Sequence, residues 1–267
     1  MKRPPIFSRN DRPSPAFLVP VLSVLILLLA GARAQAGETV VAVAANFTDT
    51  ARELAQMFEA RTDHQVTLSF GSTGKLYAQI ANGAPFDVFL AGDAERPELA
   101  VSAGLAVAGT RFTYAEGKLV LWSLEPALVE QGRRYLAEAS PERLAIANPV
   151  TAPYGLAAQQ VMQRLGVWQR LEPRLVRGES IAQTFQFVAT ANAEAGFVAL
   201  AQLRGWSGAM GSAWEVPQAL YDPVVQQAVL LNRGRDNDAA RAWLAFLREA
   251  EAVAVIESYG YGVPAGQ

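Results

Sequence analysis

The stretch Gln65-Val-Thr-Leu-Ser-Phe-Gly-Ser-Thr-Gly-Lys-Leu-Tyr-Ala-Gln-Ile80 determines the predicted fold class. Its first part, Gln65–Phe70, is typical of a strand, and the glycine-rich turn Gly71–Gly74 then ends it. Leu76 and Ile80 follow at the spacing of one helix face. A strand, a tight turn and a helix form one β-turn-α unit, and repeated units of this kind build a parallel sheet covered by helices.

The same alternation continues on both sides of this stretch. Further strands are predicted over 39–44, 86–91, 118–123, 144–147, 196–199 and 224–231. Helices are predicted over 51–60 and 239–247, and others open at positions 71, 152 and 180. We therefore expect an α/β protein of two lobes, each a mostly parallel sheet flanked by helices, with hinge crossings near 117–119 and 225–231. The predicted boundaries are 37–117 plus 231–267 for lobe 1 and 118–230 for lobe 2.

Residues 1–36 have the pattern of an export signal that is removed from the mature chain. Four basic residues precede an uncharged run from Ala16 to Gly31, and the segment ends in Ala34-Gln-Ala36, a small-residue cleavage pattern. The alternative is a transmembrane anchor. The run is shorter than the roughly 20 apolar residues that span a bilayer, and it contains Pro20. A cleaved signal and a periplasmic mature chain are therefore predicted.

Composition excludes several functions. The net charge of −2 becomes −6 once the signal, with five basic residues and one acidic residue, is removed, which argues against nucleic acid and anionic membrane surfaces as partners. The chain contains no cysteine, so disulfides, thiolate nucleophiles and thiolate metal sites are excluded. The single histidine, His64, lies in a polar segment that we interpret as a solvated turn.

Three predicted strand ends carry groups suited to binding an anion. They are Ala44-Ala-Asn-Phe-Thr48, Gly71-Ser-Thr-Gly74 and Ala152-Pro-Tyr-Gly155. Each places free backbone N–H groups, and often a hydroxyl or an amide, at the positive end of a helix, where an anion binds without a cationic side chain. Ordinary N-capping is the alternative at each position. The presence of three such turns in two units favours a binding site.

Catalytic motifs do not fit the same residues. The turn at 71–74 lacks the glycine and the hydroxyl residue that a P-loop needs around its lysine, and it is not a Gly-x-Ser-x-Gly elbow. Lys75 is expected to be a surface residue, and Asp87 is expected to form a cap or a salt bridge. Asp93 and Glu95 are expected to be solvated. No segment has metal-ligand spacing.

Six segments together resemble the periplasmic molybdate-binding proteins. They begin with Val-Ala-Val-Ala-Ala-Asn-Phe-Thr (41–48), Ser-Phe-Gly-Ser-Thr-Gly-Lys-Leu-Tyr-Ala-Gln-Ile (69–80) and Gly-Ala-Pro-Phe-Asp-Val-Phe-Leu (83–90). They continue with Ala-Ile-Ala-Asn-Pro-Val-Thr-Ala-Pro-Tyr-Gly (145–155), Leu-Gly-Val-Trp (165–168) and Tyr-Gly-Tyr-Gly (259–262). The ordered set covers essentially the whole predicted mature chain.

The resemblance implies a type II binding-protein fold with a tetrahedral oxyanion in the cleft. The ligand positions of the family fall on Asn46, Thr73, Tyr154 and Ile181, with Ser72 as a possible neighbour. A fifth position, often tyrosine in the family, falls on Ala199, which leaves open whether the phenol of Tyr154 replaces it.

The same resemblance implies the ligand and the partners. The ligand is molybdate or tungstate, so molybdenum enters only as the oxyanion and no side chain ligates a metal directly. The implied partner is the membrane permease of an ABC importer, and the protein is expected to be a monomer without a cofactor.

Two alternatives remain at this level. The first is a binding protein for another tetrahedral oxyanion, such as sulfate. The second is an enzyme, which would need an acid/base pair or a nucleophile in the cleft. The residues expected to converge there carry amides, hydroxyls and backbone N–H groups, so we expect no enzymatic activity. A structural or adhesion module is disfavoured because the turns at the strand ends suit a small anion.

Overall fold

The computed structural model describes residues 1–2, 36–139 and 141–264. The predicted export signal lies almost wholly outside these residues. Within them, no helix combines the length and the hydropathy needed to cross a membrane.

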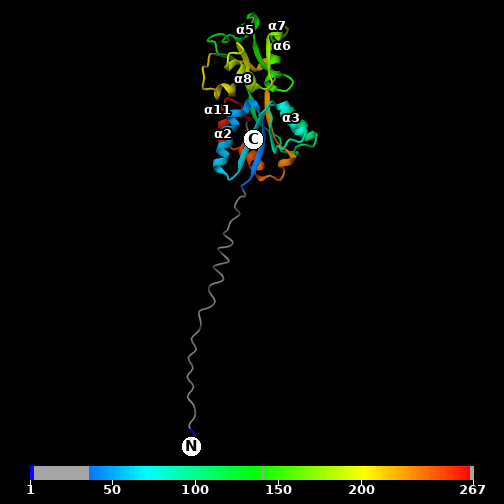
Figure 1. Cartoon of the computed structure of the whole chain (residues 1–267), viewed down its shortest axis with the longest axis vertical. Coiled ribbons are helices and arrows are strands. Elements are labelled where there is room, and N and C mark those ends of the chain that lie inside the picture. Colours follow the sequence, from blue (N-terminus) through cyan, green and yellow to red (C-terminus); the bar gives the residue numbers. More distant parts are fainter. Residues whose placement is uncertain (3–35, 140, 265–267) are drawn as a thin grey trace. The chain divides into compact units, whose positions relative to one another are not determined.

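The described chain forms two five-stranded sheets (Figure 1). In the first, strands lie in the order β2-β1-β3-β10-β4, with β1 parallel to β2 and β3, and β10 antiparallel to β3 and β4. Their bounds are Glu38–Ala44 (β1), Gln65–Gly71 (β2), Val88–Leu90 (β3), Phe112–Gly117 (β4) and Val224–Leu230 (β10).

The second sheet repeats this mixed arrangement. Its order is β7-β6-β8-β5-β9, with β6 parallel to β7 and β8, and β5 antiparallel to β8 and β9. The strands are Leu119–Ser123 (β5), Leu144–Ala147 (β6), Leu175–Gly178 (β7), Ala195–Ala199 (β8) and Ser212–Glu215 (β9). The two-lobed α/β fold is confirmed, with sheets that are evenly mixed because each contains two antiparallel pairings.

Among the α-helices, those that follow the parallel-paired strands β1, β2, β6 and β7 are the ones that bear on the site. They are α2 (Thr48–Arg61), which follows the short helix η1 (Ala45–Phe47), α3 (Thr73–Ala81), α6 (Pro153–Arg164) and α8 (Ile181–Ala189). Their apolar faces form the core; in α2, for example, Ala51, Leu54 and Phe58 are buried at helical spacing. The remaining α-helices are α4 (Glu95–Ser102), α5 (Gly132–Glu138), α7 (Trp168–Leu171), α9 (Leu200–Arg204), α10 (Asp238–Phe246) and α11 (Ala250–Ser258).

The chain passes between the sheets twice. It leaves the first sheet at Gly117 and enters the second at Leu119, and it returns after β9 at Val224. Strand β10, which the sequence prediction placed in lobe 2, therefore pairs within the first sheet. A β-branched run predicts a strand but does not specify the sheet that the strand joins. Below, lobe 1 denotes residues 36–117 and 224–264, and lobe 2 denotes residues 118–223.

The prediction for His64 was wrong. The side chain is 9% exposed rather than solvated, its Nδ1 accepts a hydrogen bond of 3.1 Å from the Gly37 N–H, and its ring stacks on Phe58 at 6.0 Å. This histidine supports the start of β1 and packs against Phe58 of the lobe 1 core.

Candidate oxyanion site

The paired strands of each sheet bring their following helices side by side. Strands β1 and β2 pair residue by residue up to Ala44 and Gly71, so η1 and α3 start next to each other. In lobe 2, β6 and β7 pair up to Ala147 and Gly178, ahead of the starts of α6 and α8. Each lobe therefore presents two helix N-termini at the carboxyl edge of its sheet, where ligands of α/β proteins bind.

All five predicted site residues meet in one small cavity between the lobes. The space in it that is open to the centre of a water molecule is about 10 Å³, so its walls would have to move apart slightly to admit a tetrahedral oxyanion. None of the nine residues that line it has a charged side chain. They are Ala44, Ala45, Asn46, Ser72, Thr73, Ala152, Pro153, Tyr154 and Ile181.

The backbone N–H groups at this cavity are unengaged. Thr73 and Ile181 are the first residues of α3 and α8, and Asn46 and Tyr154 are the second residues of η1 and α6. N–H groups at these positions have no acceptor within their helix. Within the described chain, the backbone N–H of these four residues makes no hydrogen bond to another backbone group. Four residues at helix starts, each with a backbone N–H that has no backbone partner, thus line one uncharged cavity.

The hydroxyl of Ser72 also has no partner. Ser72 is 4% exposed, and its Oγ makes no hydrogen bond although it precedes the first turn of α3. Ser180, which precedes α8, instead accepts from the Gln183 N–H at 3.3 Å. N-capping therefore accounts for Ser180 and does not account for Ser72. A buried hydroxyl without a partner, at a cavity, is free to hydrogen-bond a ligand that binds there.

Thr73 is placed to donate into the site. Its side chain is 1% exposed, and its Oγ1 accepts a hydrogen bond of 3.0 Å from the Gly92 N–H. Because an oxygen lone pair of this hydroxyl is already used, its proton is left for a further acceptor.

The structure corrects the expected role of the Asn46 side chain. Its Nδ2 already donates to Gln226 Oε1 at 2.8 Å and to the Tyr261 hydroxyl at 3.1 Å, which uses both of its hydrogens. Tyr261 in turn donates to the Asn46 carbonyl at 2.8 Å. The amide of Asn46 thus fixes the backbone at the start of η1, and the group that remains free is the backbone N–H.

The phenol of Tyr154 is likewise engaged away from the cavity. Its oxygen accepts from Gln226 Nε2 at 3.3 Å and is buried, and burial raises its pKa well above 10, so the phenol stays protonated near neutral pH. What α6 presents to the cavity is the Tyr154 N–H. Ala199, the position where the family often has tyrosine, does not line the cavity, and its N–H donates to Gln202 Oε1 at 3.0 Å.

Sequence reasoning missed Gln226 and assigned no role to Tyr261. Tyr261 lies in one of the segments that carried the resemblance. Gln226 offered only a weak signal, a polar residue within the strand Val224–Leu230. Its side chain is fully buried and forms hydrogen bonds with Asn46 and Tyr154.

Direct contacts hold the lobes together around the site. The Gly74 N–H of lobe 1 donates to the Thr151 carbonyl of lobe 2 at 2.9 Å. Lys75, predicted to be a simple surface residue, is half exposed but forms an ion pair with Glu179 of lobe 2 at 2.5 Å. The described arrangement is therefore a closed one.

The acidic residues near the strand ends do not line this cavity. Asp87 is buried, pairs with Arg233 at 2.5 Å and accepts from the Val40 N–H, which confirms the predicted salt bridge. Asp93 differs from the prediction, because its side chain is only 16% exposed and hydrogen-bonded to Arg96, and burial raises its pKa. In the described ranges, no group of three or more histidine or acidic residues could hold a metal ion.

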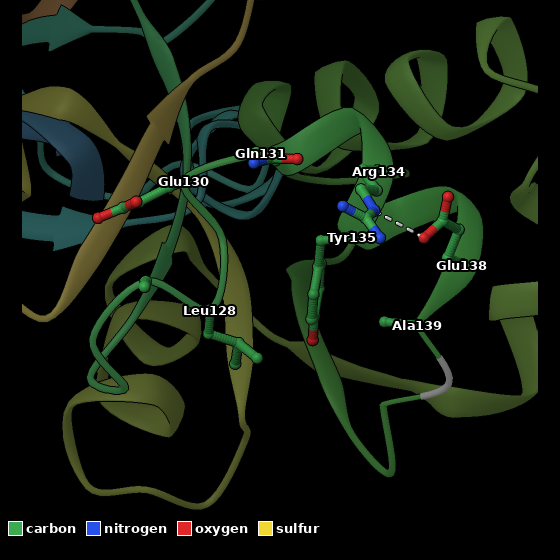
Figure 2. Close-up of a pocket in the computed structure, with 8 residues that line it drawn as sticks. Leu128, Glu130, Gln131, Arg134, Tyr135, Glu138 and Ala139 are labelled. Carbon is green, nitrogen blue, oxygen red and sulfur yellow. Dashed lines mark hydrogen bonds and ion pairs between the residues drawn. The ribbon is translucent and has the colours of Figure 1, made fainter.

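A much larger hollow, of about 490 Å³, lies within lobe 2 (Figure 2). Arg134 and Glu138 at its edge form an exposed ion pair of 2.8 Å within α5, and Glu130 adds a second acid. This hollow is not at the carboxyl edge of the sheet and does not contact lobe 1. The small cavity is the better candidate because buried, unsatisfied donors converge there.

Comparison with known proteins agrees with this geometry. Residues 39–262 match the family described as bacterial extracellular solute-binding proteins. The chain is 53% identical to the molybdate-binding protein ModA of Rhodobacter capsulatus over 228 residues, which cover 85% of this chain and 89% of that protein. It is 52% identical to ModA of Azotobacter vinelandii over 231 residues, which cover 86% and 92% of the two chains.

A solved structure extends the likeness to three dimensions. The periplasmic molybdate-binding protein of Azotobacter vinelandii matches with a TM-score of 0.81 at 42% identity, covering 85% of this chain and 99% of that chain. The chain therefore belongs to the bacterial extracellular solute-binding proteins and, among them, to the family of molybdate-binding proteins.

Proposed function

We propose that this protein binds molybdate in the cavity between its lobes and delivers it to an ABC importer. The observation that carries the proposal is the convergence of four unengaged helix-terminal N–H groups and the unpartnered Ser72 hydroxyl on one uncharged cavity. Such a set of donors suits an anion that carries several oxygens and no proton.

In the proposed complex, both lobes hold the oxyanion. Lobe 1 contributes the N–H groups of Asn46 and Thr73 and the hydroxyls of Ser72 and Thr73, and lobe 2 contributes the N–H groups of Tyr154 and Ile181. The helix dipoles balance the charge of the dianion without a cationic side chain. A ligand that touches both lobes favours the closed state by its differential affinity for that state.

The donor set predicts an order of ligands. Molybdate and tungstate near neutral pH are dianions without a proton and can accept from every donor. Sulfate also lacks a proton but is smaller, so it would leave hydrogen bonds stretched. Hydrogen phosphate needs an acceptor for its proton, and none of the residues that line the cavity has a carboxylate. The order is molybdate close to tungstate, then sulfate, then phosphate.

The remaining parts of the proposal concern the cellular setting. Residues 1–36 direct export and are removed, the mature chain acts in the periplasm as a monomer, and a membrane permease receives the ligand. The protein carries its ligand without transforming it and uses no cofactor.

Isothermal titration at fixed ionic strength with molybdate, tungstate, sulfate and phosphate tests this function. We expect one site per chain for molybdate and tungstate and much weaker binding of the other two. Sulfate binding as tight as molybdate binding would overturn the molybdate assignment and leave an oxyanion carrier. The absence of binding for all four ions would overturn the oxyanion site itself.

A further inference from the structure

A buried chain of hydrogen bonds connects the two lobes beside the candidate site. Gln226 lies at its centre, fully buried on β10 of lobe 1. Its Oε1 accepts from Asn46 Nδ2 at 2.8 Å, and its Nε2 donates to the phenol oxygen of Tyr154, in lobe 2, at 3.3 Å. One side chain therefore contacts a site residue from each lobe.

The local backbone is shaped for this contact. The register of β10 against β4 shifts between Gln226 and Gln227, an irregularity that redirects a side chain. Gly117, at the end of β4, leaves the space that the contact fills. A Cβ atom at Gly117 would lie 1.9 Å from the Tyr154 hydroxyl and 2.8 Å from Gln226 Nε2. No side chain at position 117 is compatible with the observed positions of both groups.

Two neutral phenols lie beside this chain of hydrogen bonds, Tyr114 at Gln226 and Tyr261 at Asn46. Tyr114 and Tyr261 are buried, and burial raises the pKa of both phenols well above the ordinary value. Both are therefore neutral at physiological pH. The hydroxyl of Tyr114 lies 3.1 Å from Gln226 Oε1 and 3.1 Å from the Ala91 carbonyl. With Oε1 turned toward Tyr114 and Asn46, Nε2 is left to face Tyr154.

We propose that Gln226 is a positioning residue of the oxyanion site, which sets the distance between the N–H groups of Asn46 and Tyr154 by binding both side chains across the hinge. This inference rests on the proposed function of the same cavity. An amide is suited to the role because it accepts at one end and donates at the other. Removal of either contact leaves a buried polar group unpaired, so the closed arrangement becomes less favourable and less well defined.

The test is a double-mutant cycle read by molybdate titration. Gln226→Leu removes both contacts, and Tyr154→Phe removes the phenol but keeps the ring and the backbone N–H. We expect Gln226→Leu to weaken molybdate binding roughly 3- to 10-fold. We also expect the ratio of molybdate to sulfate affinity to fall, because the spacing of the donors is less fixed. In the Tyr154→Phe background, Gln226→Leu should cause a markedly smaller loss, since one of its contacts is already absent.

Gln227→Leu is the matched control. It is the next residue on β10, and its Nε2 bonds Thr113 Oγ1 at 3.1 Å within lobe 1. This variant should keep the affinity and the selectivity of the wild-type chain. If it shifts both as strongly as Gln226→Leu, the effect belongs to the strand in general and the assignment of Gln226 is overturned.

Two outcomes would overturn the positioning role while leaving the proposed function intact. One is a loss of equal size from Gln226→Leu in both backgrounds. The other is an unchanged ratio of molybdate to sulfate affinity. A wild-type chain that binds no molybdate would instead overturn the proposed function. In that case the same double-mutant cycle is measured on the free energy of unfolding in urea, without ligand. Additive effects of Gln226→Leu and Tyr154→Phe would then show that the two side chains do not interact, and would overturn the positioning role too.

Discussion

Lys75 Nζ lies 2.5 Å from Glu179 Oε2, so an ion pair joins helix α3 of lobe 1 to the loop that precedes α8 of lobe 2. Both side chains are more than half exposed. Each belongs to a segment that also contributes a candidate ligand residue, Thr73 in one case and Ile181 in the other. The pair joins the two lobes, so we expect it to form when the lobes are closed and to break when they separate.

Loss of this ion pair should weaken ligand binding slightly. An exposed pair contributes about 0–1 kcal/mol, so Lys75→Met should lower the molybdate affinity by no more than about 5-fold, and the difference should shrink as salt is added. Titration at low and high ionic strength measures this. Arg134→Met breaks an exposed pair inside α5 and serves as the control, which should leave the affinity unchanged. An effect of Lys75→Met that grows with salt would contradict this account.

Ile181→Pro should abolish one donor without disturbing its helix. Ile181 is the first residue of α8, where proline is favoured, and Ser180 has the extended backbone that suits a residue before proline, at φ −149° and ψ 167°. Loss of a hydrogen bond to a charged ligand costs about 1.5–3 kcal/mol, or roughly 10- to 100-fold in affinity.

Ile181→Ala keeps the N–H and is the control, with an expected loss well below that of the proline variant. Circular dichroism should show intact helices in both. Equal affinities for the two variants, as measured by isothermal titration, would exclude the Ile181 N–H as a ligand donor.

The Thr73 hydroxyl should be needed for tight binding. Thr73→Val keeps the shape and removes the hydroxyl, and it should weaken molybdate binding by roughly 10- to 100-fold. Thr73→Ser retains the hydroxyl and should stay close to the wild-type affinity. The valine variant also leaves the Gly92 N–H unpaired, so its melting temperature should fall as well. If Thr73→Val binds molybdate with the wild-type affinity, the Thr73 hydroxyl does not bind the ligand and has only a structural role.

Buried phenols should make the protein sensitive to alkali. Burial raises the pKa of Tyr135 to about 12 and that of Tyr154 well above 10, whereas the same phenols ionise near 10 in the unfolded chain. Folding therefore favours the protonated phenols. This stability is fully present below pH 10 and is lost as the pH rises through the folded values.

Urea unfolding at pH 8, 9, 10 and 11 should show a constant free energy up to about pH 9 and a decrease above it. At pH 11 the free energy of unfolding should be clearly lower than at pH 8, because the Tyr135 phenol ionises more readily in the unfolded chain. The phenolate absorbance, recorded over the same pH range, should show that the buried tyrosines ionise at a higher pH than the exposed ones. A free energy that is unchanged at pH 11 would contradict the burial of these phenols.

Local sequence patterns predicted where helices start beyond strands. The strand-turn-helix pattern at 65–80 located the start of α3, and similar turns pointed to Asn46 and Tyr154, whereas Ile181 came from the family resemblance alone. These residues, with Ser72 and Thr73, line one cavity. The helix starts were predictable because the residues that determine them are neighbours in the sequence. The directions of the Asn46 and Tyr154 side chains were not predictable in this way, since their partner Gln226 lies 180 and 72 residues away along the chain.

The same reason explains why the sequence did not predict the sheet that β10 joins or the burial of His64. The run 224–231 predicted a strand, but the pairing of β10 with β3 and β4 depends on contacts distant in sequence. His64 stands among polar neighbours, and only the fold brings Phe58 and the Gly37 N–H against it.

The central claim is that uncharged donors from four helix starts hold the oxyanion between the lobes. The most direct test is an anomalous difference map, recorded at the molybdenum absorption edge, from crystals grown with molybdate. The account predicts one peak per chain, with the ion's oxygens about 3 Å from the backbone nitrogens of Asn46, Thr73, Tyr154 and Ile181. A peak in the hollow around Arg134 and Tyr135, or none between the lobes, would contradict it.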